Sequence, residues 1–164
     1  MSNHGYIDQN LIQNSALACF LLVSFVHSYE QLTAKTASPE LMKLLLILPI
    51  CWHKASCSAI QSRQASTPLH AVLSDSPLIK VDFQDRISAF SAATLQGLNL
   101  GCASGLLERK FDRDVPCLTT TFDRWPQKSK PVTAPAEMLN AIDRLANWFK
   151  DASTAELYSQ FLRK

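Results

Sequence analysis

The chain lacks the sequence signatures of the common catalytic and nucleotide-binding sites. It contains no GxxxxGK[ST] phosphate loop, no GxSxG motif and no HExxH motif. Asp82 and Asp85 lie close in sequence but have no matching carboxylate pair elsewhere in the chain. Cys51 and Cys57 lie near His53, yet nothing in the pattern orients these residues as a nucleophile and its base. We therefore expect no enzymatic activity, no cofactor, no metal site and no small-molecule substrate.

Paired cysteines and long apolar runs are also missing. The five cysteines are odd in number, scattered mostly through apolar stretches, and never spaced as CxxC, so we interpret them as buried free thiols of a reducing compartment. The most hydrophobic stretch, residues 41–52, contains Lys43 and Pro49 and is shorter than the ~20 apolar residues that span a bilayer. The apolar run near Leu11 has no basic segment before it, unlike a signal peptide. These absences predict a cytoplasmic protein with no membrane partner.

Net charge does not indicate a partner, because 16 basic residues are nearly balanced by 14 acidic ones. The local distribution is less even. Residues 1–34 contain no Lys or Arg, whereas residues 105–130 contain six basic and four acidic side chains. A bias of this size is typical of an ordinary solvated surface. With 164 residues and 47% hydrophobic composition, the chain can bury one sizeable core.

Hydrophobic periodicity predicts a mainly α protein with a small β-ribbon. Residues 8–33 have the pattern of a long helix that is apolar nearly all round, and His27 within it is interpreted as an interior residue. Ser38-Pro39 predicts the start of a helix over residues 39–48 that Pro49 ends or bends. Further helices are expected to about residue 63, over residues 69–73 after Ser66-Thr67-Pro68, and from about residue 83.

The prediction of the fold rests mainly on residues 86–122, which have the pattern of a helix followed by a two-stranded ribbon. Their first half has helical periodicity and ends in Gly101, Ala103, Ser104 and Gly105, where we expect a residue of positive φ. Two short β-like runs follow, residues 106–111 and 117–122, separated by a polar turn over residues 112–116. The four-residue spacing of the glycines is typical of close helix packing and a turn into the ribbon. Short helices, a longer helix and a ribbon occur in this order in winged-helix domains.

Three segments make up the predicted domain organisation. Residues 1–125 form a helical, winged-helix-like domain with an N-terminal helix (8–33) and a wing (106–122). Residues 126–135 are a proline-rich linker by composition. Residues 136–164 form a C-terminal helical attachment with an amphipathic helix and a last helix capped by Ser153 and Glu156. The attachment is expected to pack either back on the domain or on a partner.

The segment Trp52-His53-Lys54 is the candidate partner contact, and two interpretations of it are open. In the first, it presents an aromatic ring, a titratable group and a cation to another protein at the start of a helix. In the second, Trp52 fills the core, His53 caps a carbonyl and Lys54 is solvated.

The predicted wing offers Arg109, Lys110 and Arg113 as candidate contacts to DNA phosphates. Glu108, Asp112 and Asp114 stand among these cations and would oppose an anion. The helix before the wing carries no Lys or Arg over residues 88–104, although phosphate neutralisation supplies most non-specific affinity for DNA. The pattern therefore favours a winged helix that binds protein.

Four short signals in residues 6–108 carry a resemblance to a known family. They are LPI-x-x-HK from Leu48, T-x-L from Thr67, F-x-x-R from Phe83 and G-x-x-x-G-L-L from Gly101. With these signals the chain resembles the middle component of bacterial three-component ABC systems, a family that includes the small accessory subunits of Lamassu-type defence operons.

The resemblance implies a non-enzymatic subunit that bridges an SMC/Rad50-like ATPase and an effector, often a nuclease, in defence against phage or plasmids. It also implies that the complex binds DNA mainly through the ATPase and that this subunit contacts DNA mainly indirectly. Leu48, Pro49, His53, Lys54, Gly101, Gly105 and Leu106 match the family's pattern without a catalytic role. The alternatives are a stand-alone winged-helix transcription regulator that binds DNA and an inhibitor subunit that binds one target without any ATPase.

Overall fold

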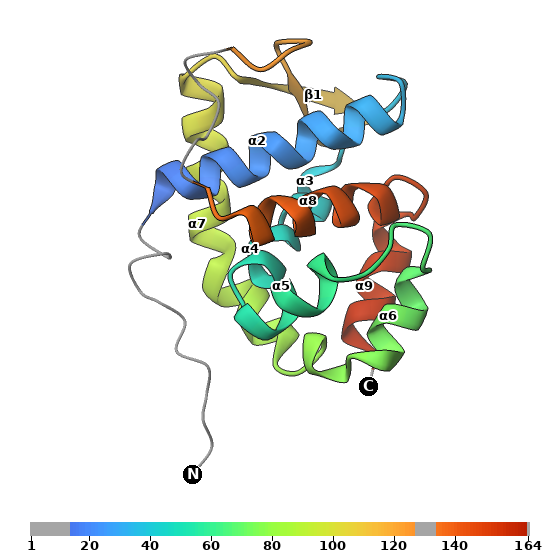
Figure 1. Cartoon of the computed structure of the whole chain (residues 1–164). Helices are drawn as coiled ribbons and strands as arrows, with labels where there is room; N and C mark the ends of the chain where they lie inside the picture. Colours follow the sequence, from blue (N-terminus) through green and yellow to red (C-terminus); the bar gives the residue numbers. More distant parts are fainter. Residues whose placement is uncertain (1–13, 127–133, 164) are drawn as a thin grey trace.

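The computed structural model describes residues 14–126 and 134–163 (Figure 1). Within them the chain is mostly helical, with one antiparallel two-stranded sheet, which confirms the predicted mainly α class with a small β-ribbon. The elements in chain order are α2 (Ser15–Leu32), α3 (Leu41–Leu44), α4 (Ile47–Cys51), α5 (Lys54–Gln61), α6 (Leu69–Asp75), the 3₁₀ turn η1 (Pro77–Ile79), α7 (Phe83–Ala103), β1 (Leu107–Asp112), β2 (Val115–Thr120), α8 (Ala136–Phe149) and α9 (Thr154–Leu162). The winged-helix detail stays a prediction.

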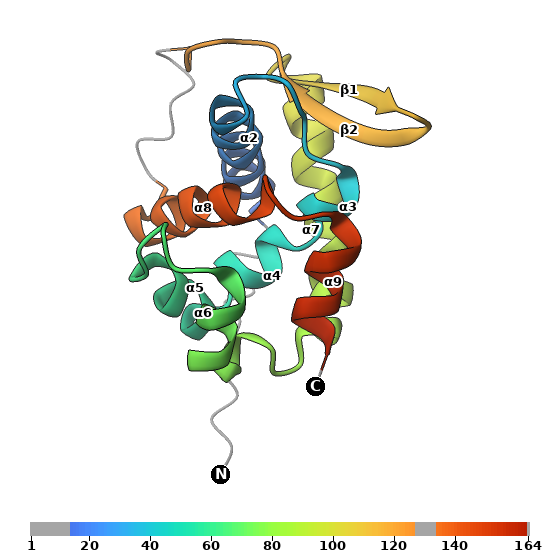
Figure 2. The ribbon, with the colours of Figure 1, turned by 90° about the vertical axis from the view of Figure 1, so that its right-hand side faces the viewer.

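Helix α2 is the centre of the fold, and α7 and α8 pack against it (Figure 2). Its middle is buried almost all round, as the continuous apolar run predicts. Asn14 caps its start, because the side-chain Oδ1 accepts a hydrogen bond from the backbone N–H of Leu17 at 2.9 Å. Residues 8–13 of the predicted helix lie outside the described residues.

Helix α7 follows its prediction closely and ends where the glycines indicate. The N–H of Leu106 donates to the carbonyl of Gly101 at 2.9 Å, which closes the last turn. Gly105 has φ +74, a left-handed conformation that an L side chain would strain. The helix therefore stops at this position, and the chain turns directly into β1.

The ribbon is present, but its predicted boundaries are wrong by one or two residues. The turn consists only of Arg113 and Asp114, with φ values of 47 and 67, and Asp112 pairs with Val115. Two successive left-handed residues match the twist of the flanking strands, so a two-residue turn extends the ladder toward the tip. The expected five-residue turn would have left Val115 and Pro116 outside β2.

The predicted helix over residues 39–48 is replaced by two short ones. The helix breaks at Leu45 and Leu46, before Pro49, and Pro49 lies within the first turn of α4. A proline is tolerated there because the first N–H groups of a helix have no partner inside it. The predicted role of Pro49, to end or bend a helix over residues 39–48, is therefore wrong.

The Ser38-Pro39 and Ser66-Thr67-Pro68 patterns predict a Ser or Thr cap before each helix, and the structure has neither cap. Glu40 occupies the cap position of α3, while the Oγ of Ser38 donates to Glu30 at 2.9 Å and the carbonyl of Pro39 accepts from the N–H of Leu118. Pro68 itself occupies the cap position of α6. At α3, Ser38 does not cap the helix because its hydroxyl is bonded to Glu30, a residue from another part of the fold.

The C-terminal helices pack back on the domain and share its hydrophobic core. The ring of Phe161 in α9 stacks on Phe83 with 4.8 Å between centroids and meets Phe149 of α8 edge-on at 6.2 Å. The capping box of Ser153 and Glu156 is present, as predicted. Most of the predicted linker, residues 127–133, lies outside the described residues.

Within residues 14–126 and 134–163, no helix by itself combines the length and the hydrophobicity that a membrane span requires. Residues Leu41–Cys51 and Lys54–Gln61 pass that test only together, as a pair bent by 101°.

Candidate partner-binding surface

Trp52 of the predicted contact segment lies in the core. Its side chain is 4% exposed, and its ring meets Phe90 of α7 edge-on with 5.6 Å between centroids. A partner cannot reach this indole without opening the α4–α7 packing. Burial of Trp52 fits the second interpretation, whereas the exposure of Lys54 fits both, so partner contact at Lys54 stays a prediction.

His53 caps the start of α5 with its ring. Its Nδ1 accepts from the N–H of Ser56 at 3.3 Å and lies 2.7 Å from the Oγ of the same serine. The sequence interpretation expected a carbonyl as the partner; the structure instead uses the ring as an acceptor at the helix N-terminus. Burial, and after it the charge of Arg86, lowers the pKa of His53. The neutral ring that the cap requires is thus favoured.

Acidification should therefore destabilise the protein through this cap. Because the pKa of His53 is lower in the folded chain than in the unfolded chain, the unfolded state binds more protons as the pH falls below the ordinary histidine range. The contribution of the neutral His53 ring to the free energy of unfolding is then present near pH 7 and is lost as the pH falls through the folded-state pKa. Thermal unfolding of wild type at pH 7 and pH 5 should show a drop in Tm, and His53→Asn, which keeps a capping acceptor, should reduce that drop.

His27 provides the comparison for this measurement, since burial also lowers its pKa. It stacks on Phe122 with 5.3 Å between ring centroids, away from α5. His53→Asn should thus remove only part of the pH dependence. An unchanged drop in the variant would contradict a contribution from the His53 cap.

Arg86 links four parts of the chain from the first turn of α7. Its guanidinium donates to the carbonyls of Pro49 (2.7 Å), Ile79 and Val81 (3.1 Å), and to the Oγ of Ser56 (3.2 Å). It is 6% exposed, and burial lowers its pKa to about 10, well above neutral pH. In the sequence Arg86 ends the F-x-x-R signal and begins the stretch of residues 86–122, but neither pattern predicts these four hydrogen bonds.

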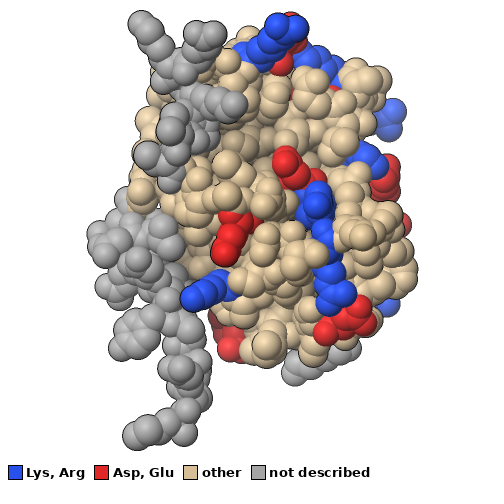
Figure 3. All heavy atoms as spheres, viewed as in Figure 1, with Lys and Arg blue, Asp and Glu red and all other residues tan. Residues whose placement is uncertain are grey.

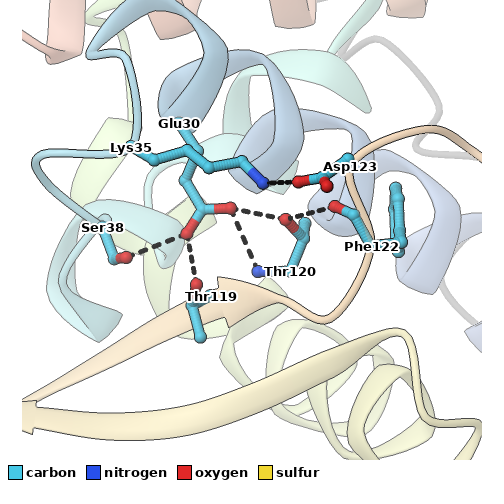
Figure 4. Close-up of polar contacts among 7 residues, drawn as sticks. All are labelled: Glu30, Lys35, Ser38, Thr119, Thr120, Phe122 and Asp123. Carbon is cyan, nitrogen blue, oxygen red and sulfur yellow. Dashed lines mark hydrogen bonds and ion pairs between the residues drawn. The ribbon is translucent and has the colours of Figure 1, made fainter.

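Glu30 holds the base of the ribbon to α2 (Figure 4). Its buried carboxylate accepts from the Oγ of Ser38 at 2.9 Å and from the hydroxyls of Thr119 and Thr120. It also accepts from the backbone N–H of Thr120 at 3.1 Å. Charge-assisted bonds of this kind are stronger than neutral ones, so the base of the ribbon is held firmly against α2.

The three predicted phosphate contacts lie on the exposed part of this ribbon. Arg109, Lys110 and Arg113 are all exposed, but Lys110 lies 3.7 Å from Glu108, and the guanidinium of Arg109 lies over the Phe111 ring at 5.8 Å. Basic and acidic side chains are likewise interspersed over the face in Figure 3. The ribbon is therefore a surface of mixed charge, and contact with phosphate stays a prediction.

An apolar groove of about 470 Å³ lies between α7 and the ribbon. Its lining residues come from α3, α7 and both strands: Leu41, Leu95, Leu98, Asn99, Cys102, Leu107, Glu108, Arg109, Pro116 and Leu118. Leu95 on its wall is 45% exposed, and Phe111 farther along the ribbon is 65% exposed. A groove with apolar walls beside exposed apolar side chains is typical of a protein-binding surface. The sequence does not predict this groove, because its walls come from elements that are separate in the chain.

The cysteines of the described chain are free thiols, and all except Cys102 are buried. Burial raises the pKa of Cys19 and of Cys57 to about 11, so both are neutral, unreactive thiols at neutral pH. Over residues 14–126 and 134–163, no three His, Cys, Asp or Glu side chains are grouped to hold a metal ion.

Comparison with known proteins identifies one family. The family model described as ABC-three component (ABC-3C) system Middle Component 3 matches residues 7–163. No curated protein and no solved structure matches the chain.

Proposed function

The chain belongs to the ABC-three component system Middle Component 3 family, and on that premise we propose that it is a non-catalytic subunit bridging an SMC/Rad50-like ATPase and an effector. The effector is of nuclease type, and the complex acts in the cytoplasm against phage or plasmids, as in Lamassu-type systems. The observation that carries this proposal is the extent of the match, which covers nearly the whole chain.

The buried polar residues support a structural role for the subunit. Lys43 is 5% exposed, and its Nζ donates to the hydroxyl of Tyr29 (3.1 Å) and to the carbonyls of Phe149 (2.9 Å) and Ala152 (2.7 Å). Glu30 and Arg86 are likewise occupied by groups of the chain itself. Such groups stabilise one packing of the helices and are not positioned to act on a substrate.

The stand-alone regulator is less well supported. Arg86 is the one Lys or Arg of α7, and it is buried in the hub, so α7 presents no cation to a phosphate. The charges of the ribbon are mixed. We therefore propose that DNA contact comes mainly through the ATPase.

The proposal is tested by affinity purification of the tagged full-length protein from its native host, followed by mass spectrometry. We expect a large coiled-coil ATPase and a second product of the same operon. Recovery of the protein alone, or with promoter DNA only, would refute the bridging function.

Lys54→Glu makes this experiment sharper, because Lys54 is exposed at the first position of α5. An acidic residue is favourable at a helix N-terminus, so the variant should fold at least as well as wild type. If Lys54 contacts a partner, recovery of that partner should fall about tenfold, which corresponds to a loss of about 1.4 kcal/mol in binding. The exposed Arg124→Glu is the matched control and should recover both partners normally.

A further inference from the structure

The outer edge of β2 is already occupied. The N–H of Leu118 donates to the carbonyl of Pro39 at 3.1 Å, and the N–H of Thr120 donates to Glu30 at 3.1 Å. Pro116, the remaining residue facing this way, has no N–H. This side of the sheet therefore offers little to an incoming strand.

The outer edge of β1 is open. Arg109 lies opposite Leu118, whose N–H points away from β1, so this pair is of the type that exchanges no hydrogen bonds. By alternation, the backbone groups of Leu107, Arg109 and Phe111 point to the outside of the sheet. None of the described residues bonds to them, and side chains 108–112 are exposed. In Figure 2, β2 is the strand nearer to α3, and β1 lies on the side of the ribbon away from α3.

We propose that β1 pairs antiparallel with β1 of a second copy of this chain, with Arg109 on the two-fold axis. Antiparallel pairing around this residue places Glu108 opposite Lys110 of the partner subunit, and the converse pair is identical by symmetry. These are the non-hydrogen-bonded positions of the new ladder, at which opposed side chains lie closest. Each copy thus contributes one acidic and one basic residue to two ion pairs.

The same register places the most exposed large apolar side chain over the groove. Phe111, which is 65% exposed, lies opposite Leu107 of the partner subunit, and directly opposed residues share a face of the sheet. Leu107 lines the groove, together with Leu95 and the exposed Cys102. The ring of one copy therefore covers the groove of the other.

Neighbouring registers are disfavoured by charge. A shift of two residues in one direction places Glu108 opposite its own copy, and a shift in the other places it opposite Asp112 of the partner subunit, with Lys110 opposite its own copy. The proposed register has one like-charge pair, Arg109 with its symmetry mate, against two attractive pairs. Each Arg109 lies over its own Phe111 ring, so the guanidinium is displaced toward that ring.

The test is sedimentation velocity of the purified full-length protein over a concentration series. The pairing involves about five residues a side, at the small end of specific interfaces, so we expect a reversible dimer with a Kd on the order of 10 µM. Glu108→Lys and Lys110→Glu should each weaken the dimer about 100-fold, because two close attractions become repulsions. The double variant should restore it.

Mixing the two single variants gives a stricter result. One chain then has Lys at positions 108 and 110 and the other has Glu, so the mixture should form heterodimers although neither variant dimerises alone. Lys54→Glu is the control and should leave the dimer unchanged. A monomer at every concentration, or a dimer insensitive to both variants, would overturn the proposal. A monomer whose ribbon variants lose a co-purifying protein would overturn it too, in favour of a strand from that protein. The result does not depend on the bridging function, which is tested by recovery of the ATPase.

Discussion

Replacing Arg86 with Met should destabilise the protein by about 4 kcal/mol, near the upper end for a single substitution. The methionine fills much of the space of the arginine stem but donates no hydrogen bond. The carbonyls of Pro49 and Ile79 would then be left buried without their donor. A buried acceptor that loses its partner costs about 1–3 kcal/mol. Urea unfolding followed by circular dichroism measures the effect.

Arg86→Lys is the matched control, because it keeps the positive charge and loses the planar fork. A lysine ammonium cannot reach Pro49 within α4 and Val81 after η1 at the same time with the geometry of the guanidinium. We expect a loss of about 2 kcal/mol, between wild type and Arg86→Met. A methionine variant within about 1 kcal/mol of wild type would show that the hub adds little to stability.

Gly97→Ala should also destabilise the protein, with a net loss of about 2 kcal/mol. A Cβ at this position would lie 2.9 Å from the Cβ of Ala18, 3.0 Å from the carbonyl carbon of Ala18 and 3.0 Å from the backbone nitrogen of Cys19. The obstacle is largely the backbone of α2, so the two central helices must separate. This separation opposes the gain of about 1 kcal/mol that alanine brings to a helix interior.

Gly101→Ala, one turn farther along α7, separates crowding from helix propensity. Its Cβ would lie 2.8 Å from Cδ1 of Leu107 and 3.3 Å from Cγ2 of Val23, both ends of side chains that can move. The crowding and the helical gain should nearly cancel, which leaves stability within about 1 kcal/mol of wild type. Equal losses at the two glycines, measured by thermal unfolding, would contradict the backbone contact at Gly97.

The folded chain explains why several residues of the four family signals are needed. Pro49 and Arg86 belong to two separate signals and meet in one hydrogen bond. His53 caps α5, and Gly101 admits Leu107 against α7. These positions therefore maintain the fold. The surfaces that we propose for partners lie at Lys54 and along β1.

Features that depend on neighbours along the chain could be predicted before the structure was known. Apolar periodicity predicted α2, α7 and α8, the glycine of positive φ predicted the end of α7, and Ser153 with Glu156 predicted the start of α9. These signals work because helical periodicity and caps involve residues within a few positions of each other.

The contacts of the polar residues and the bounds of the short helices depend instead on segments that are distant in the sequence. Glu30 binds Thr120 across 90 residues, and Lys43 binds the carbonyl of Phe149 across 106. The break before Pro49 and the use of Ser38 follow from such distant contacts. A local rule pairs each polar group with the nearest backbone group. A buried polar group without a hydrogen bond is costly, however, so its partner is supplied by whichever chain segment packs against it.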